Sequence, residues 1–373
     1  MLQNDGYVLV TGAAGFIGSY LSDLMARSHR LVLIDSFDPQ IHGDAAVVRS
    51  SIIKFDVALD SFDLLDQFGE PKAIVHLAAK TGTSQSMYEL ENYYSTNVVG
   101  LARLLDFALK KKKTLKHFVF TSSRSVYGEG SYFCNNCSSI FLGKRYKNDL
   151  DLGFFEVRCN DCGAISKAVG TNERSSLDPR SHYALTKLAN ESQISLALAK
   201  SEITFCNLRL QNVIGVGQSL KNPYTGVLGI FASLALANQP ISIFENGQIA
   251  RDFVSVKDIA RVISMCLERE DLPSSLNVGS GTATGLVDVA RSIVSFYGSS
   301  SAVSSTSKFR DGDIAVNFAD LAVFRSVFPS FDFEKFDFIL PKYLEWVQSC
   351  GGLDLDRFAS SMLELQDRGL ISK

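Results

Sequence analysis

The segment SHYALTK places a tyrosine and a lysine, Tyr183 and Lys187, four residues apart. In a helix this spacing brings both side chains to one face. The lysine ammonium would then lower the pKa of the phenol, and the positive ring of a bound nicotinamide would lower it further. A phenol tuned in this way can act as a general base near neutral pH. The alternative is a chance pair on a surface helix, which has the same spacing.

Four cysteines form a second group that could do chemistry. The segments FCNNC and RCNDC each contain a C-x2-C pattern, and 21 residues separate the two pairs. Each pair brings two thiolates to one side of a tight turn, and a hairpin of this length can close a tetrahedral site. Four sulfur ligands leave no open position for water, so the metal would be a structural zinc ion. The predicted ligands are Cys134, Cys137, Cys159 and Cys162.

Two disulfides, idle thiols or a redox role for one pair are the alternatives, and a reducing compartment disfavours the disulfides. The surrounding segment, 129–172, is too polar and too short to bury a core of its own. A metal would supply the folding free energy that it lacks, so we predict a zinc-ribbon-like insert. The remaining cysteines are scattered and are expected to be buried as small apolar side chains: Cys206, Cys266 and Cys350.

A glycine-rich turn near the amino terminus predicts a dinucleotide site. YVLVTGAAGFIGSYLSDLM has the pattern of a strand, a turn and an amphipathic helix. Gly12 would permit the tight turn, Gly15 would let the backbone approach a pyrophosphate, and Gly18 would let helix and strand pack closely. A second strand, 31–34, ends at Asp35, whose carboxylate could accept ribose hydroxyls and would repel a 2'-phosphate, which favours NAD. A plain turn in an α/β protein is the alternative.

The elements that would position these residues alternate between strands and helices. Short apolar runs at 52–55, 73–77 and 118–120 are separated by helical segments such as 88–109. This alternation predicts an α/β fold with a doubly wound parallel sheet of the Rossmann type and right-handed crossovers. Ligands of such sheets lie at the carboxyl ends of the strands. The residues at that edge are Asp35, Asp56, 76–79 and 121–123.

Composition limits the class of protein. With 373 residues, 46% of them hydrophobic, the chain can bury a large core. A formal net charge of -3 provides no global basic field, so neither nucleic acid nor a membrane surface is an expected partner. The first strand leaves no room for a secretion signal, and no apolar run approaches the roughly 20 residues of a membrane span. We therefore expect a cytoplasmic protein with reduced thiols.

An ordered series of motifs extends along nearly the whole chain. They are VTGAAGFIGS, HLAAKTG, NVVG, TSSRSVYG, YALTK, RLQNVIG, RDFVSV, LNVGSG and FRDGDIAVNFAD. In these motifs the chain resembles the extended short-chain dehydrogenase/reductase family, specifically its nucleotide-sugar epimerases and dehydratases. The resemblance implies that Tyr183 is the general base, that Lys187 is its partner and a ribose ligand, and that Ser123 shares the hydrogen bond to the substrate.

The resemblance also implies further binding residues, and Asn97 would in addition support the active-site helix. Beside Tyr183 and Lys187, NAD would contact Gly12, Gly15, Phe16, Ile17, Gly18, Asp35, Asp56, Val57, Leu77, Ala78, Ala79, Asn97 and Thr121. Arginine forks suit phosphate oxygens, so Arg251 and Arg310, with Asn212, would hold the diphosphate of a nucleotide sugar. A surface salt bridge is the alternative for either arginine. Ser84, Ser86, Ser123 and Tyr224 would line the sugar pocket.

The residues after the catalytic hydroxyl indicate which reaction to expect. Dehydratases of this family carry an Asp-Glu pair there, whereas this chain has Arg124 and Ser125. Without an acid and base for elimination, we expect epimerisation: Tyr183 takes a proton from a sugar hydroxyl, hydride passes to NAD, and it returns to the other face of the ketone, most often at C4. The alternatives are a dehydratase, a nucleotide-sugar oxidoreductase with net redox change, and a non-catalytic nucleotide sensor.

A closer resemblance narrows the sugar. FDPQIHG, TSQSMYEL and KNPYTGVLGIFAS, together with the cysteine insert, are similar to the dTDP-L-rhamnose 4-epimerase group. This favours dTDP-L-rhamnose and dTDP-6-deoxy-L-talose as the interconverted pair, and the alternatives are a uridine nucleotide or a different deoxysugar.

Three regions follow from these assignments. They are a NAD-binding domain (1–128, 173–215 and 240–270), the insert (129–172) and a smaller nucleotide-sugar-binding domain (216–239 and 271–373). Strands at 205–208 and 241–244 are expected to return to the central sheet. In relatives the helices 88–109 and 182–200 form a homodimer interface, so the resemblance implies a homodimer.

Overall fold

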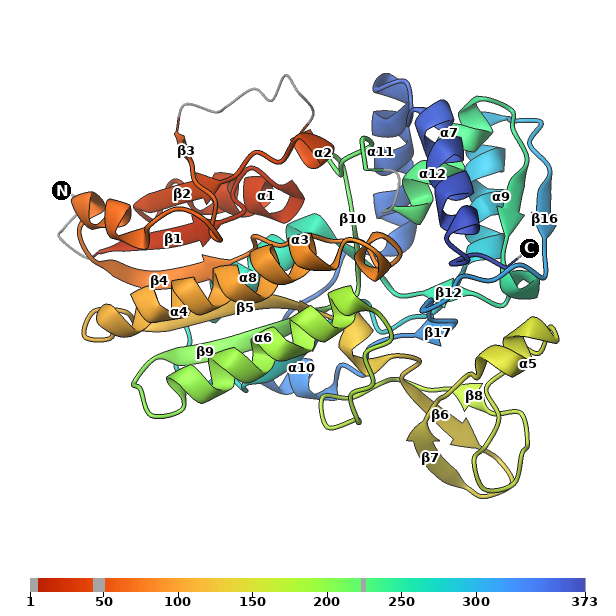
Figure 1. The fold of residues 1–373 in the computed structure, drawn as a ribbon, viewed down its shortest axis with the longest axis horizontal. Coiled ribbons are helices and arrows are strands. Elements are labelled where there is room, and N and C mark those ends of the chain that lie inside the picture. The colour runs from red at the N-terminus through yellow and green to blue at the C-terminus, as the bar shows by residue number, and fades with distance from the viewer. Residues whose placement is uncertain (1–5, 43–50, 223–225, 373) are drawn as a thin grey trace.

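The computed structural model describes residues 6–42, 51–222 and 226–372. Its largest element is a seven-stranded sheet with the order β14-β9-β5-β4-β1-β2-β3 (Figure 1). Every neighbouring pair in this sheet is parallel, which confirms the predicted doubly wound arrangement. The strands are β1 (Tyr7–Thr11), β2 (Leu31–Asp35), β3 (Ile52–Lys54), β4 (Pro71–His76), β5 (His117–Ser123), β9 (Thr204–Leu210) and β14 (Ser275–Val278).

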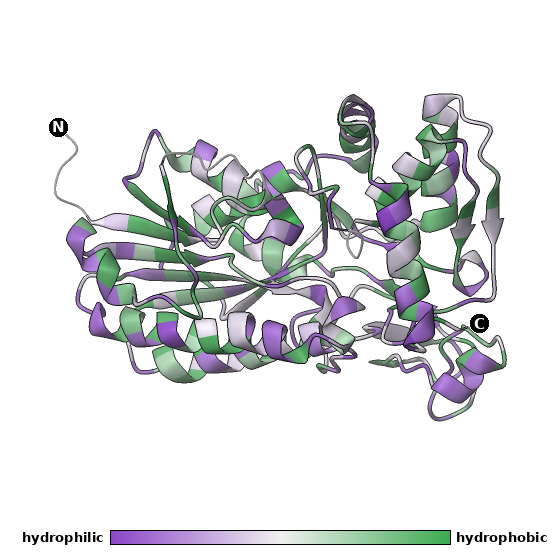
Figure 2. Ribbon diagram, turned by 45° about the horizontal axis from the view of Figure 1, so that its top comes forward, coloured by the Kyte–Doolittle hydropathy of each residue, from purple (hydrophilic) through white to green (hydrophobic). Residues whose placement is uncertain are grey.

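Helices cover both faces of this sheet, because successive strand residues point to opposite sides. Val8 and Val10 pack in one core with α1 (Phe16–Met25) and α8 (Val256–Cys266). Tyr7 and Leu9 pack in a second core with α4 (Gly100–Lys110) and α6 (His182–Leu198). Hydrophobic residues run along the strands between these helical layers (Figure 2).

The helix predicted at 88–109 is divided into three segments. They are α3 (Leu90–Tyr94), a π-helical segment (Ser95–Val99) and α4. A Cβ at Gly100 would lie 2.7 Å from Val57 Cγ2, so the glycine permits close packing where α4 begins. Shorter helical elements are α2 (Pro39–His42) and the 3-10 segments Phe62–Phe68, Gln85–Met87, Arg124–Tyr127 and Glu245–Gly247.

A smaller helical lobe lies beyond the carboxyl edge of the sheet (Figure 1). Its core is formed by α7 (Val227–Leu236), α9 (Leu286–Tyr297) and α11 (Phe336–Ser349), with strand β11 (Ile241–Ile243) paired in parallel to β16 (Val303–Ser305). Helix α12 (Leu355–Asp367) completes the lobe.

Two expectations about strand placement are wrong. The strand at 241–244 does not return to the central sheet, because Ile241 and Ile243 bury their side chains between α7 and α9. Conversely, the domain bounds predict β14 in the smaller domain, whereas it forms the edge of the central sheet and pairs with β9. Helix α10 (Ala322–Val327) packs with β14, and Phe324 joins the core on the α1 side.

The cysteine insert forms its own small sheet at the side of the molecule (Figure 1). Strand β6 (Ser131–Cys134) pairs in antiparallel fashion with β7 (Ser139–Leu142) and β8 (Lys167–Ala168), and α5 (Lys147–Asp151) follows. Two further small sheets complete the described structure. They pair β10 (Asn212–Ile214) with β13 (Phe253–Ser255), and β12 (Ala250–Arg251) with β15 (Thr284–Gly285) and β17 (Val316–Asn317).

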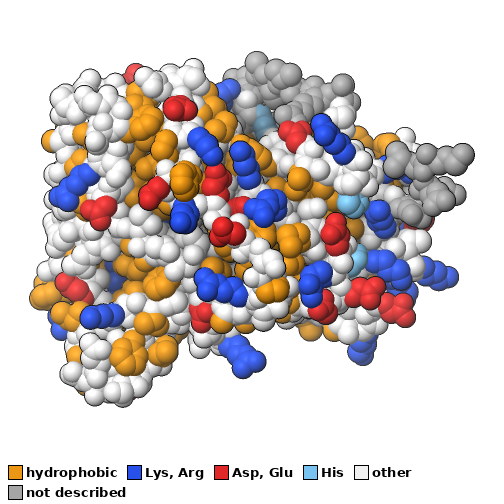
Figure 3. Space-filling view, turned by 180° about the vertical axis from the view of Figure 1, so that it is seen from behind, with side chains coloured by type: hydrophobic (Ala, Val, Ile, Leu, Met, Phe, Trp, Pro, Cys, Tyr) orange, Lys and Arg blue, Asp and Glu red, His pale blue; other side chains and the backbone are white. Residues whose placement is uncertain are grey.

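The surface mixes charges of both signs. On the face in Figure 3, Lys and Arg side chains are interspersed with Asp and Glu side chains, in keeping with the formal net charge of -3. Among the described residues, no helix has both the length and the apolar character that crossing a membrane requires.

Candidate active site

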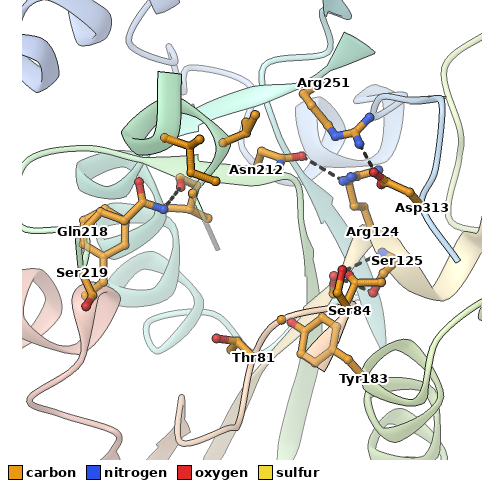
Figure 4. Close-up of a pocket in the computed structure, with 18 of the residues that line it drawn as sticks. Thr81, Ser84, Arg124, Ser125, Tyr183, Asn212, Gln218, Ser219, Arg251 and Asp313 are labelled. Atoms are coloured by element: carbon orange, nitrogen blue, oxygen red, sulfur yellow. Dashed lines mark hydrogen bonds and ion pairs between the residues drawn. The ribbon is translucent and has the colours of Figure 1, made fainter. Parts of the chain in front are cut away.

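A cavity of about 750 Å³ lies between the carboxyl edge of the sheet and the smaller lobe. Its lining includes the glycine turn, Ser123 and Tyr183, and the two arginines Arg251 and Arg310. Figure 4 shows Tyr183 beside Ser84, with Asn212, Arg124 and Arg251 across the cavity. The residues that the sequence assigned to three separate tasks are therefore brought together in one place.

Helix α6 positions the tyrosine and the lysine. The helix begins after Ser181, whose hydroxyl accepts a hydrogen bond from the Ala184 amide and so caps the first turn. Lys187 is buried, and its Nζ donates to the Thr121 carbonyl oxygen at 2.7 Å and lies 5.9 Å from the centre of the Tyr183 ring. Burial lowers the pKa of Lys187 to about 7, and the negative charge of Glu191 opposes this shift.

The pKa of Tyr183 differs from the sequence-based expectation. Burial raises it above its ordinary value, while a hydrogen bond from Ser123 and the positive charge of Arg124 lower it. The prediction that Lys187 would lower this pKa is not what the structure shows, since the ammonium is directed to the Thr121 carbonyl. The charge of Arg124 acts on the phenol instead.

Ser123 ends strand β5 and faces the same cavity. Its Oγ accepts hydrogen bonds from the amide of Ser125 at 3.2 Å and from the Ser125 hydroxyl at 2.9 Å. Two donors from the following turn therefore fix the orientation of the Ser123 hydroxyl, which can then direct its own proton toward a neighbouring oxygen.

The glycine turn has the geometry that a dinucleotide needs. Gly12 has φ +70°, and a Cβ there would lie 2.7 Å from the Ala78 amide nitrogen. A Cβ at Gly18 would collide with the carbonyl oxygen of Gly12, so each of these two positions requires glycine. Gly15 caps α1 without a side-chain hydrogen bond, and no acidic residue occupies the first turn of the helix. The free amides at this helix end fit a pyrophosphate.

Asp35 lies at the end of β2, as predicted, and its carboxylate is tied to the backbone. One oxygen accepts from the Ala14 amide at 2.9 Å and the other from the Phe37 amide at 2.8 Å. The Asp56 carboxylate accepts from the Ala58 amide at 2.8 Å. Both carboxylates therefore also shape the loops that carry them.

The other predicted NAD contacts fall into two groups. Phe16, Ile17, Leu77 and Ala79 line the cavity with the glycines. The second group is not among the lining residues: Asp35, Asp56, Val57, Ala78, Asn97 and Thr121. Asn97 is completely buried and bonds to the Lys80 backbone and, at 3.0 Å, to the Thr186 hydroxyl on α6. It thus supports the active-site helix.

The predicted diphosphate ligands are close together. Arg251 pairs with Asp313 at 2.9 Å, and its other amino group, Nη1, donates to three backbone carbonyls. Arg310 donates to the Met362 sulfur at 3.3 Å, and its Nε is buried with no hydrogen-bond partner in the described chain. Asn212 accepts a hydrogen bond from Arg124 Nε at 2.9 Å.

Three predicted sugar contacts have different outcomes. Ser84 lines the cavity. Ser86 does not: it is buried, and its hydroxyl donates to the Thr83 carbonyl at 2.6 Å. Ser84 and Ser86 would face the same side only in an extended segment. Ser86 lies instead in a 3-10 segment, Gln85–Met87, so its side chain points in a different direction. Tyr224 lies outside the described residues.

Sequence reasoning missed Arg124 and Asp313 as site residues. Both line the cavity, and Asp313 carries the ion pair that orients Arg251. In the sequence, Arg124 is distinguished only by standing where a dehydratase has an acid. Its position directly after Ser123 was the available signal.

The four cysteines of the insert converge. Their sulfur atoms all lie within 4.8 Å of one another, with Cys134 and Cys162 3.5 Å apart and Cys159 and Cys137 3.9 Å apart. The prediction for the remaining cysteines is partly wrong. Cys206 and Cys266 are buried, as predicted, and a hydrogen bond between them together with burial raises the pKa of the Cys206 thiol. Cys350 is instead exposed at the end of α11.

Comparisons with known proteins agree with this geometry. The model of the NAD dependent epimerase/dehydratase family matches residues 8–140 and 162–279, so the interruption in the match falls inside the insert. A dTDP-L-rhamnose 4-epimerase from Burkholderia thailandensis is 37% identical over 323 residues, which are 84% of this chain and 87% of that protein. A putative UDP-glucose 4-epimerase from Methanocaldococcus jannaschii is 26% identical and covers 78% of this chain and 83% of that protein.

Solved structures share the fold. MoeE5 in complex with UDP-glucuronic acid and NAD is 26% identical, has a TM-score of 0.72, and covers 92% of this chain and 100% of that one. A UDP-N-acetylglucosamine 4-epimerase from Methanobrevibacter ruminantium M1 is 24% identical with a TM-score of 0.72, over 93% of this chain and 99% of that one. The second likeness concerns the fold alone.

Proposed function

Because the chain belongs to the NAD dependent epimerase/dehydratase family, we propose that it is an NAD-dependent 4-epimerase of a nucleotide-activated sugar. The preferred pair is dTDP-L-rhamnose and dTDP-6-deoxy-L-talose, which the 37% identity to a dTDP-L-rhamnose 4-epimerase favours. The observation that carries the reaction type is the lining of the cavity. Its acidic residues, Asp311 and Asp313, are on the arginine side, and Asp313 is already paired with Arg251. Beside Tyr183 no lining carboxyl group in the described chain is available for an elimination.

The chain's own residues would handle the proton of the sugar hydroxyl. Ser123, whose oxygen is fixed by Ser125, hydrogen-bonds that hydroxyl, and the Tyr183 phenolate accepts its proton while the carbon is oxidised to the 4-keto sugar. NAD, when bound, supplies the reversible hydride acceptor. Tyr183 then gives the proton back to the sugar oxygen after the keto sugar has turned over. No net oxidation results, since proton and hydride both return to the sugar.

The experiment follows inversion directly. The purified protein is incubated with a panel of dTDP and UDP sugars, and NMR monitors the proton coupling at C4. We expect inversion of one ring carbon without loss of water and without any requirement for added reductant. If turnover consumes added NADH or NADPH stoichiometrically, the protein is an oxidoreductase with a net redox change. If the product has lost one molecule of water from the sugar, the protein is a dehydratase.

We also propose that the four cysteines hold a structural zinc ion. Tetrahedral zinc with bonds of about 2.3 Å to sulfur separates its ligands by roughly 3.8 Å, whereas a disulfide bond is about 2.05 Å long. The distances of 3.5 Å and 3.9 Å fit the first value. All four thiols are free, which also fits the cytoplasmic location that we propose.

Two exposed cysteines give a matched test of zinc binding. We expect one zinc per chain by metal analysis, a loss of zinc in Cys137→Ser, and no loss in Cys350→Ser. Chelation is expected to increase hydrogen exchange in 129–172 while NAD binding persists. Loss of NAD on mild chelation would contradict the proposal that the metal serves only the insert.

A further inference from the structure

Arg124 occupies a position that connects the reacting centre with the arginine cluster. Strand β5 ends at Ser123, and Arg124 begins the 3-10 turn that follows it. Its side chain reaches β10, where Nε donates to Asn212 Oδ1 at 2.9 Å (Figure 4). Asn212 therefore fixes the plane of the guanidinium. The same planar group lies beside Asp313, the partner of Arg251.

One donor of this guanidinium is unused. Arg124 Nη1 has no contact with solvent and no hydrogen-bond partner in the described chain. A buried charged donor left without a partner is unfavourable, and charged donors form the strongest hydrogen bonds with anionic oxygens. Arg310 is in the same condition, because its Nε is also buried and unpaired among the described residues. Two arginines of one cavity thus each have a free donor.

The charges around Arg124 favour an anion over a neutral ligand. Three guanidinium groups line this part of the cavity, and Asp313 is committed to Arg251 by an ion pair of 2.9 Å. Burial and the neighbouring Arg251 together lower the pKa of Arg124 to about 9, although Asp313, Asp252 and Glu129 oppose the shift. Asp252 is itself occupied by the Ser280 hydroxyl and backbone amides. The three guanidinium groups outnumber the two carboxylates that line the cavity, Asp311 and Asp313, so the excess charge is positive and favours an anionic ligand such as a diphosphate.

We propose that Arg124 is a third diphosphate-binding arginine of this enzyme, in addition to Arg251 and Arg310. Its guanidinium, which lines the cavity, donates to an anionic oxygen of the phosphate nearest the sugar. This inference rests on the proposed nucleotide-sugar substrate and extends it. Because Arg124 directly follows Ser123, one peptide segment binds both the phosphate and the sugar hydroxyl that loses its proton. The position of the diphosphate then sets the position of the sugar relative to Tyr183.

Calorimetric binding of nucleotides without a sugar tests the role independently of turnover. UDP and dTDP are titrated into the full-length protein with NAD present, and UMP and dTMP serve as ligands that lack the second phosphate. Arg124→Met is expected to weaken binding of the diphosphates about 10-fold or more, because it removes a charge-assisted hydrogen bond. Binding of the monophosphates is expected to stay within about 2-fold of the wild type on the same reasoning.

Two more variants distinguish the loss of the charge at Arg124 from a general effect of replacing an arginine. Arg124→Lys is expected to be intermediate, since lysine supplies a point charge without the planar fork. Arg291→Met, at an arginine whose side chain is 69% exposed on α9, should match the wild type for every nucleotide. Unchanged thermal melting of Arg124→Met, together with a selective loss of diphosphate binding, would support a direct contact.

Other results would overturn the inference. Diphosphate binding by Arg124→Met within about 2-fold of the wild type would remove Arg124 from the phosphate site. Equal losses for monophosphates and diphosphates would indicate a structural role. If the wild type binds the diphosphates but inverts no sugar, the assigned contact stands and the proposed reaction fails. If the wild type binds neither diphosphate, both fail.

Discussion

The phenol of Tyr183 must lose its proton before it can accept one from a sugar. Tyr183→Phe removes only the hydroxyl, so we expect kcat to fall about 100-fold or more while the fold is retained. The measurement is the NMR inversion assay, with thermal melting and diphosphate binding as controls for folding and for the substrate site. Turnover that survives in Tyr183→Phe would contradict the proposed general base.

The pH dependence of turnover should reveal which charge acts on that phenol. Burial raises the pKa of Tyr183, and Arg124 lowers it, so removal of the arginine charge is expected to raise it further. A base works only when deprotonated, so kcat should increase with pH, and the increase should move to higher pH in Arg124→Met. The profile of kcat against pH, compared between wild type and Arg124→Met, checks this shift. An unchanged profile would indicate that Arg124 does not influence the phenol.

The pKa of Lys187 in the active site should affect how the free energy of unfolding depends on pH. Its folded-state pKa is about 7, below its ordinary value of 10.5, because the ammonium is buried. Between these two pH values the unfolded chain binds the proton and the folded chain does not, so the free energy of unfolding rises with pH. Below pH 7 the buried charge is retained and destabilises the fold. We expect Lys187→Met to be relatively more stable than the wild type at low pH, and this advantage to decrease as pH rises through the window.

Denaturant unfolding of both proteins at several pH values between 6 and about 10 tests this linkage. The difference between the two proteins is the informative quantity, because other groups titrate in both. A difference independent of pH would show that Lys187 keeps its ordinary pKa in the fold.

A buried ion cluster attaches the cysteine insert to the wall of the cavity. Arg145, in the insert, contacts Glu129 and Glu245 at 2.6 Å each and donates to the Asp313 carbonyl at 2.9 Å. Glu129 in turn accepts from the Ala315 amide at 2.9 Å. The three charged side chains are 6% exposed or less. The insert is thereby connected to the loop that carries Asp313, the partner of Arg251.

Removing the arginine should release that connection. Arg145→Met leaves two buried carboxylates without their cation, so we expect the free energy of unfolding to fall by about 3–5 kcal/mol. Diphosphate binding should also weaken because Asp313 loses its support. Lys144→Met, at the adjacent exposed side chain, is the matched control and should stay within about 0.5 kcal/mol of the wild type. Urea unfolding and nucleotide calorimetry measure the two effects, and a change of less than 1 kcal/mol in Arg145→Met would contradict this role.

Local sequence patterns predicted helices, strands and turns better than they predicted which of these elements pack together. The glycine turn, the cysteine pairs and the Tyr183–Lys187 spacing each depend on neighbours within a few residues, and the structure brings each group together. The pairing of β11 depends on contacts with β16, about 60 residues away, and its sequence was equally compatible with the central sheet. The role of Arg124 also depends on distant residues, Asn212 and Asp313. Burial is the largest influence on the pKa of Tyr183. The four-residue spacing of Tyr183 and Lys187 does not show how deeply the phenol is buried, so the sequence could not predict this shift.

At the level of the whole molecule, exposed apolar side chains on neighbouring helices predict self-association. Leu185 and Leu196 of α6 are 43% and 83% exposed, and eleven residues, about three helical turns, separate them on one face. Leu90 and Val99, on the adjacent helical segments, are 40% and 50% exposed. A second copy of the chain could bury these residues by packing the same helices together about a twofold axis.

We therefore expect a homodimer in solution, with a mass by light scattering of about twice the chain mass of 40.9 kDa. Two charges on one face of α6 should prevent the association, because each would be buried without a partner. The double variant Leu185→Glu, Leu196→Glu is thus expected to be monomeric, with the fold retained. Leu59→Glu, at a leucine 76% exposed before the 3-10 segment Phe62–Phe68, is the control and should stay dimeric. A monomeric wild type, or a double variant that remains dimeric, would show that this helical face is not the interface.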